Sequence, residues 1–182
     1  MKKRVAHLIT ALDIGGTEQM LLNIVPRLNE HGLENHVICM KGRGVIGREL
    51  TEKGVVVHYL DFNHPWDILK SARRFLVKMK TFEPEVLVTY LVHADFFGRI
   101  FGSIMLGIKG VVYRRGPYLK WEFLSHFDRW TQKKVARHLV VSNWLKRELE
   151  KNGFEKRKIQ ILPNSVEIAA FEDLPVETRN KY

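Results

Sequence analysis

The sequence predicts an α/β domain of the Rossmann-like, three-layer αβα type, with a mostly parallel sheet between two layers of helices. Strand-like and helix-like runs alternate along nearly all of its 182 residues, which is typical of βαβ units and a parallel sheet. The length suits one domain, because single domains usually contain about 100–200 residues. The composition, 45% hydrophobic and 27% charged, is that of an ordinary folded protein.

Seven short runs rich in β-branched and aliphatic residues are predicted to form the strands. In chain order they are residues 4–10, 35–40, 55–60, 86–91, 111–114, 138–141 and 159–162. Amphipathic helices are expected between them. These are a helix from Gly16 to His31, a short helix over 45–53, a longer one over 65–82, one over 95–106, and one that begins after Ser142. The less regular stretch 116–134 is expected to hold a loop and a helix.

Local signals support several of these boundaries. Pro65 suits the first turn of a helix, where its fixed φ and missing N–H cost little. Pro84 predicts that this helix ends near Phe82. Ser142 can accept a hydrogen bond from an exposed N–H of the helix that follows it. Gly153 comes just after that helix, where a left-handed residue is favoured.

Charge and hydropathy exclude some classes of protein and leave others open. The formal net charge of +10 favours anionic partners such as nucleic acid, anionic lipid or phosphorylated ligands. The apolar runs are strand-sized, far short of the ~20 residues that span a bilayer, and no secretory signal is recognisable. We therefore expect a cytoplasmic protein, with a peripheral position at the inner face of the membrane as a further hypothesis. Cys39, the single cysteine, is expected to be a buried small hydrophobe.

Two glycine loops are candidate phosphate sites. Gly15-Gly16 follows the first strand and precedes a helix, so a bare backbone meets the positive end of a helix dipole. A tight strand-to-helix turn would need the same residues. The second loop, Gly42 to Gly47, matches G-x-G-x-x-G and has Asp61 about one βαβ unit later, as in a dinucleotide site. Its helix has only about two turns, and an earlier strand-glycine-helix unit stands where that fingerprint usually lies.

Four segments, taken together, resemble one family. They are Ile14-Gly15-Gly16-Thr17-Glu18-Gln19 with the helix end at 28–32; the stretch 50–60; His93-Ala94-Asp95-Phe96-Phe97-Gly98-Arg99; and the run 140–166 with Leu162-Pro163-Asn164-Ser165-Val166. Their order and spacing are similar to the N-terminal domain of the retaining GT-B glycosyltransferases called group 1 or family 4. Ser165 stands where glycine is commoner in that family.

The resemblance implies an acceptor-binding half of an enzyme. Residues 1–167 are expected to form the N-terminal, acceptor-side Rossmann-like domain of a GT-B fold. Residues 168–182 are expected to form a truncated linker toward a missing domain, with Pro163 and Asn164 as the interdomain hinge. In this family the nucleotide-sugar donor is held mainly by the C-terminal domain, through a basic pair and a Glu-x7-Glu motif, so the chain alone is expected to be inactive. The expected acceptor is a lipid-linked or cell-surface polysaccharide precursor.

The resemblance also assigns roles to single residues. Gly15, Gly16 and Thr17 are expected to bind the donor phosphates. Arg115 and His93 are the candidate catalytic residues, with Arg115 at a position where many members carry histidine and others arginine. A guanidinium is no base near neutral pH, so Arg115 would orient an anion or steady the departing diphosphate.

Three further residues are candidate acceptor contacts, namely Arg114, Asp95 and Glu18. Each has a simpler alternative: a solvated arginine pair at 114–115, a helix cap at Asp95 with a packed loop residue at His93, and a first-turn dipole partner at Glu18.

The remaining expectations concern cofactors and partners. The eight histidines show no metal-ligand pattern, and we expect no cofactor and no catalytic metal, with the nucleotide-sugar as substrate. A nucleic-acid-binding module is an alternative, but only the charge and aromatic residues such as Trp121 and Trp130 favour it. No nucleic-acid-binding motif accompanies them, so no nucleic-acid partner is expected. The helix 65–82, with the aromatic segment 118–130, is a candidate for contact with an anionic membrane; solvated charges on a packed helix would give the same pattern.

Overall fold

The structure of the chain, a computed structural model, describes residues 2–116 and 122–163. These residues contain a seven-stranded sheet of the order β3-β2-β1-β4-β5-β6-β7, and every neighbouring pair of strands is parallel. The strands are β1 (Lys3–Ile9), β2 (Leu33–Cys39), β3 (Val56–Tyr59), β4 (Val86–Tyr90), β5 (Lys109–Arg114), β6 (Val135–Val140) and β7 (Ile159–Ile161). The predicted α/β fold class is confirmed.

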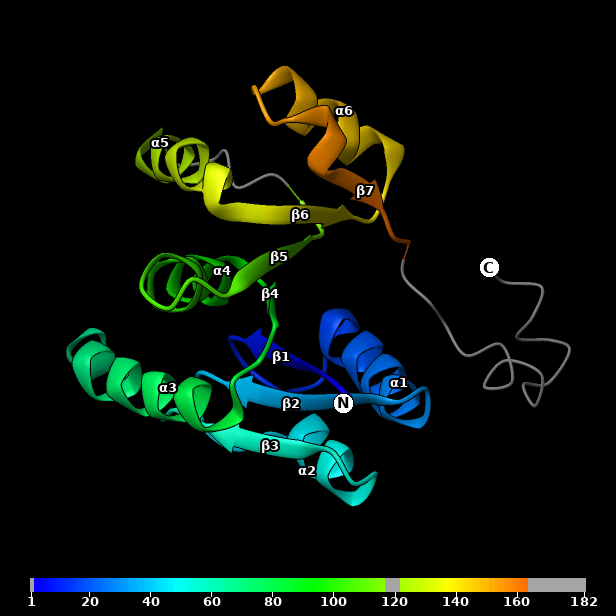
Figure 1. Cartoon of the computed structure of the whole chain (residues 1–182), viewed down its shortest axis with the longest axis vertical. Coiled ribbons are helices and arrows are strands. Elements are labelled where there is room, and N and C mark those ends of the chain that lie inside the picture. Colours follow the sequence, from blue (N-terminus) through cyan, green and yellow to red (C-terminus); the bar gives the residue numbers. More distant parts are fainter. Residues whose placement is uncertain (1, 117–121, 164–182) are drawn as a thin grey trace, which may run out of the picture.

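Helices cover both faces of the sheet (Figure 1), with α3, α4 and α5 on one face and α1, α2 and α6 on the other. They are α1 (Gly16–Glu30), α2 (Val45–Glu52), α3 (Ile68–Phe82), α4 (Val92–Gly98), α5 (Glu122–Thr131) and α6 (Asn143–Lys151). A 3₁₀ turn over Pro65–Asp67 leads into α3, and α4 continues as a π-helical segment over Arg99–Ile104.

The signals at helix ends act as the sequence indicated. Ser142 is the N-cap of α6, and its hydroxyl accepts a hydrogen bond from the backbone N–H of Leu145 at 3.2 Å. Gly153 follows α6 with a φ of +82°, the left-handed conformation that glycine adopts without strain. Helix α3 ends at Phe82, because Glu83 turns left-handed before Pro84.

Several predicted elements begin two or three residues earlier than expected, among them β2, which begins at Leu33 instead of Asn35. The helix after β4 begins at Val92 instead of Asp95, because Leu91 itself makes the turn with a φ of +70°. Strand β5 begins at Lys109 and β6 at Val135, both earlier than expected. In both strands the early residues include exposed polar side chains, which hide the strand pattern in the sequence.

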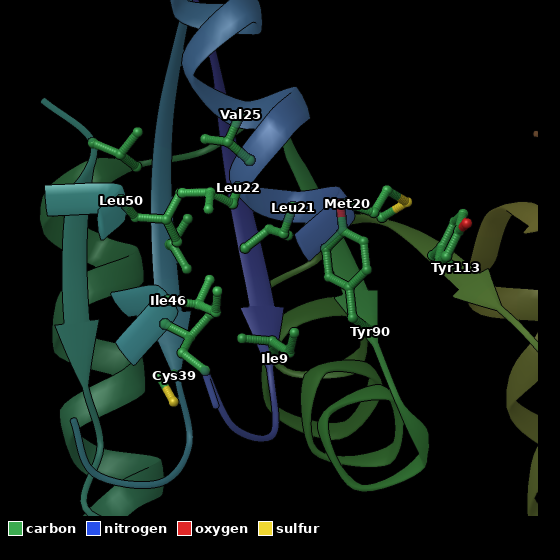
Figure 2. Packing of buried hydrophobic residues seen from close by; sticks show 13 residues of the cluster. Ile9, Met20, Leu21, Leu22, Val25, Cys39, Ile46, Leu50, Tyr90 and Tyr113 are labelled. Carbon is green, nitrogen blue, oxygen red and sulfur yellow. The ribbon is translucent and has the colours of Figure 1, made fainter. Parts of the chain in front are cut away.

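The described residues form three apolar clusters: one on each face of the sheet around its first strands, and a third that contains residues of β6, α6 and β7 such as Leu145. On the α1 and α2 face, residues such as Leu21 and Leu50 pack against Ile9 and Cys39 (Figure 2). On the α3 and α4 face, another cluster contains Phe75. Burial raises the pKa of the Cys39 thiol to about 12, so it stays protonated at neutral pH. The prediction of a buried cysteine is confirmed.

Candidate functional site

The order in which the chain adds strands to the sheet reverses between β1 and β4. From β1 the chain passes to α1 and β2 on one side, whereas the later strands continue on the other side of β4. Helices α1 and α4 therefore leave neighbouring strands toward opposite faces of the sheet. In open α/β sheets, ligands bind in the crevice at the carboxyl ends of strands at such a point. The candidate residues that follow β1, β4 and β5 all lie at this edge.

The glycine pair lies at the N-terminus of α1. Gly15 is the N-cap residue, in extended backbone, and no side chain caps the first-turn N–H groups. The Glu18 carboxylate is folded back over Gly15, so closely that a Cβ at residue 15 would collide with it. This position in the first turn is where an acidic side chain stabilises a helix. The structure therefore agrees with the simpler interpretation of Glu18, and its acceptor contact stays a prediction.

Arg115 lies directly against the start of α1. Its Nη1 donates a hydrogen bond to the hydroxyl of the buried Thr17 at 3.1 Å. The same Nη1 lies 3.0 Å from where a Cβ on Gly16 would be. Arg115 is itself exposed. One guanidinium and an uncapped helix N-terminus thus meet at the carboxyl edge of the sheet, and together they can bind an anionic group.

Arg114 faces the opposite side of the sheet from Arg115, as strand alternation predicts. It is fully buried, and its Nη1 and Nη2 donate to the two carboxylate oxygens of Asp128 on α5 at 2.8 and 2.6 Å. A buried guanidinium that is held by a carboxylate does not contact a ligand at the sheet edge. Our prediction of Arg114 as an acceptor-binding residue is therefore corrected to a structural role.

Asp95 belongs to the same buried group. It is fully buried in the first turn of α4, accepts from the Thr89 hydroxyl at 3.1 Å and from Nε of Arg99 at 2.8 Å, and forms an ion pair with Arg99. The N-cap of α4 is Leu91, so Asp95 is neither a helix cap nor an exposed acceptor contact. Both sequence-based interpretations of this residue are corrected by its burial.

Arg99 and Asp128 close this group into a network of two cations and two anions, which we call the buried ion network. Arg99 Nη1 donates to Asp128 at 2.7 Å and to Thr131 at 2.8 Å. Burial lowers the pKa of Arg99, but the carboxylates of Asp95 and Asp128 outweigh it and raise that pKa overall. Burial raises the pKa of Asp128, yet its bonds to Arg114 and Arg99 lower it overall. Arg99 and Asp128 are therefore both charged at neutral pH.

His138 on β6 lies close to the buried ion network. Only 1% of its surface is exposed, and among the described residues neither ring nitrogen has a hydrogen-bond partner. Its ring packs edge-on against Phe154. Burial, reinforced by the charges of Arg114 and Arg99, lowers the pKa of His138 from 6.5 to about 2. The imidazole is thus neutral across the physiological range.

His93 is exposed in the first turn of α4. The turn before it holds Leu91 at a positive φ, a conformation that costs an amino acid with a side chain roughly 1–3 kcal/mol. Such strain often occurs where a loop forms part of a site. The catalytic role of His93 stays a prediction, as does that of Arg115.

Of the predicted hinge, Pro163 is the last described residue and is exposed, whereas Asn164 lies outside the described residues. The predicted linker 168–182 also lies outside them, as do Tyr118 and Trp121.

The second glycine loop serves packing. A Cβ on Gly44 would collide with the backbone carbonyl of Leu12, and one on Gly47 with the hydroxyl of Tyr59. The strand before this loop is β2, which is away from the point where the strand order reverses. Close packing therefore accounts for Gly44 and Gly47, and the alternative of a dinucleotide site at Gly42–Gly47 has no support from this geometry.

Sequence reasoning missed the buried ion network and a second polar chain. Asp95 and Arg99 are four residues apart in one helical run, which is a detectable signal. Asp128 gave none, because its partners Arg99 and Arg114 lie 29 and 14 residues away. The second chain joins Tyr90 of β4, His7 of β1 and Asn35 of β2 through two hydrogen bonds of 2.9 Å. Burial lowers the pKa of His7 to about 4, so this histidine is neutral.

The described residues contain neither a cluster of metal-ligating side chains nor a helix that could span a membrane. No group of three or more metal-ligating side chains comes together there. No helix among them is long and apolar enough to cross a bilayer.

The sequence matches a known protein family over most of its length. Residues 14–170 match the family model described as Glycosyltransferase Family 4. No curated protein matches the chain significantly.

Solved structures share the fold at low sequence identity. A glycosyltransferase from Rickettsia africae superposes with a TM-score of 0.78 at 18% identity, over 99% of this chain and 48% of that one. HepE from Anabaena, in complex with UDP, superposes with a TM-score of 0.72 at 14% identity, over 94% of this chain and 46% of that one. UDP-GlcNAc 2-epimerase from Neisseria meningitidis, bound to UDP-GlcNAc, superposes with a TM-score of 0.70 at 13% identity, over 98% of this chain and 51% of that one. The chain thus spans about half the length of these proteins, and the fold also occurs in an epimerase.

Proposed function

Because this chain belongs to glycosyltransferase family 4, we propose that it is the acceptor-side domain of an enzyme that transfers a sugar from a nucleotide-sugar to an acceptor. The GT-B character of the similar solved structures agrees with this assignment. The family match covers the glycine loop, the segment around His93 and the end of β5, which are the parts that form the candidate site. The acceptor is a lipid-linked or cell-surface polysaccharide precursor.

One observation carries the proposal: Arg115 rests on the N-terminus of α1. An uncapped helix N-terminus attracts a phosphate, and a guanidinium can bind it through two parallel N–H donors. In retaining transfer, negative charge develops on the departing diphosphate, so preorganised donors here would stabilise the transition state. HepE, one of the similar structures, binds UDP, which supports a nucleoside diphosphate as the leaving group.

The donor is held mainly by a second domain. The similar structures are about twice as long as this chain, and the family's donor motifs are absent from its sequence. The sequence that follows Tyr182 tests this directly. A second Rossmann-like domain with a Glu-x7-Glu motif is expected, whereas a stop codon or an unrelated sequence contradicts the proposal. The 182-residue chain alone should fold but transfer no sugar above a heat-killed control.

A substitution series tests the role of Arg115 in the protein that carries both domains. Arg115→Ala should lower turnover at saturating donor by about 10²-fold or more, the scale for preorganised charge stabilisers. Arg115→Lys should recover only part, because a point charge replaces a fork. Gly16→Ala should lower turnover less than Arg115→Ala does, since the new Cβ would lie 3.0 Å from Nη1 of Arg115 and the guanidinium would have to shift slightly.

The matched control is Arg137→Ala, which removes an exposed arginine from β6. Normal turnover in a folded Arg115→Ala protein would refute the proposed role and direct attention to His93.

A further inference from the structure

The exposed side of α3 carries an unusual mixture of side chains. Apolar and basic residues share one line along the helix, which we call the α3 stripe: Trp66, Leu69, Lys70, Arg73, Val77 and Lys80. Trp66 is 74% exposed, Leu69 80% and Val77 54%. The spacing of these residues by three or four positions places them on one face. Large apolar groups are thus held in solvent among cations.

Packing against the sheet does not explain this stripe. Helix α3 has a separate apolar face, formed by residues such as Ala72, Phe75 and Met79, which is buried in the core. The exposed apolar residues therefore lie outside the face that the fold uses. Trp66 is moreover held in place, because its ring stacks on His64 at a centroid distance of 4.5 Å. The stripe presents an ordered surface that other described residues leave uncovered.

The charge of α3 is entirely of one sign. Residues 68–82 contain five basic residues and no acidic one. Four of the five, with Tyr59, Leu60 and Val77, line a shallow groove of about 430 Å³ between α3 and the edge of the sheet. Arg74 is engaged by Asp61 and by the carbonyl of Leu60. The other three cations of the groove are Lys70, Arg73 and Lys78. Among the described residues none of them makes a hydrogen bond or an ion pair.

We propose that the α3 stripe binds the surface of an anionic lipid bilayer. Trp66 and Leu69 enter the headgroup region, where an indole finds both apolar and polar surroundings. The ammonium and guanidinium groups of Lys70, Arg73 and Lys80 contact lipid phosphates while their stems follow the apolar boundary. Charge complementarity favours this occupant: a chain of net charge +10 presents its unpaired cations beside insertable apolar groups. A nucleic acid would use the cations but leave Leu69 and Val77 without a role.

The stripe is placed at a useful edge of the molecule. The N-terminus of α3 follows β3, so Trp66 and Leu69 lie at the carboxyl edge of the parallel sheet, as Arg115 does. Four strand spacings separate β3 from β5, which is roughly 20 Å. A bilayer at the stripe would thus lie near the candidate site, within reach of a membrane-anchored acceptor. Membrane binding is nevertheless argued independently of sugar transfer.

Co-sedimentation of the 182-residue chain with vesicles tests the proposal. The chain should bind vesicles that contain phosphatidylglycerol, bind neutral phosphatidylcholine vesicles at least tenfold more weakly, and be released by salt. Lys70→Glu with Arg73→Glu should weaken binding about tenfold or more. The matched control is Arg147→Glu with Lys151→Glu, which changes the net charge equally on α6, on the other face of the sheet. Trp66→Ala should weaken binding, whereas Trp144→Ala, which removes an exposed tryptophan of α6, should not.

Four outcomes would overturn the proposal: no binding to anionic vesicles, equal binding to both vesicle types, equal losses in the α3 and α6 double variants, or unchanged binding by Trp66→Ala. Displacement by inorganic phosphate at constant ionic strength would also overturn it, since the groove would then hold a free anion. Because no sugar donor is present, a negative result leaves the proposed transferase function untouched.

Discussion

Asp128 offers the sharpest test of how the candidate site is supported. Its carboxylate receives three charge-assisted hydrogen bonds of 2.6 to 2.8 Å, two from Arg114 and one from Arg99. Asp128→Asn keeps the shape but removes the negative charge, leaving two buried guanidinium groups with one carboxylate. Breaking a buried pair in this way costs about 3–5 kcal/mol. Since domains are stable by roughly 5–15 kcal/mol, much of the stability should be lost.

Urea unfolding of the chain, followed by circular dichroism, measures this loss. The control is Asp61→Asn, which breaks the half-exposed ion pair with Arg74 and should cost less than about 1 kcal/mol. Adding Arg114→Met to Asp128→Asn removes the uncompensated cation, so the double variant should be more stable than Asp128→Asn alone. If Asp128→Asn costs no more than Asp61→Asn, the buried ion network does not stabilise the fold as argued.

Two more predictions follow from particular contacts. Gly44→Ala should lower the free energy of unfolding by about 1–3 kcal/mol, because its Cβ overlaps the Leu12 carbonyl, whereas Gly42→Ala, with open space, should change it little. An equal effect of the two substitutions in urea unfolding would contradict this. The depressed pKa of His138 means that the unfolded chain binds its proton first, so this histidine alone should lower stability by roughly 1.4 kcal/mol per pH unit below 6.5. His138→Leu should flatten the pH dependence of urea midpoints and the exposed His31→Asn should not; an unchanged slope in His138→Leu would refute the argument.

The fold was predictable because its signals are local. Each strand and helix lies within a short run, and residues such as Ser142 and Gly153 mark ends through their own backbone chemistry. The α/β class and the family followed from these runs and their order. Boundaries failed where a local rule was broken, as at Leu91, which adopts a positive φ that no leucine favours.

The candidate site was only partly predictable, because burial and partner choice depend on long-range packing. Alternation along β5 correctly predicted that Arg114 and Arg115 point to opposite faces of the sheet. It could not predict that Arg114 would be buried against an acidic residue of a later helix. Asp128 lies in the segment that looked least regular, and nothing in its neighbours marks it. The contact of Arg115 with Thr17 spans 98 residues and is likewise absent from any local pattern.

The two adjacent arginines illustrate why the charge of the site is simpler than the sequence suggests. The buried ion network pairs two arginines with two aspartates, so its formal charges sum to zero. It therefore adds little to the electrostatic field at the sheet edge. Among the described residues, an anion that approaches the N-terminus of α1 therefore meets the guanidinium of Arg115 and the partial positive charge of the helix end, with the Glu18 carboxylate folded over Gly15 as the opposing charge. A single fork beside uncapped backbone N–H groups suits one phosphate-sized anion. It follows that Arg115→Lys, which keeps the charge and loses the fork, measures geometry separately from charge.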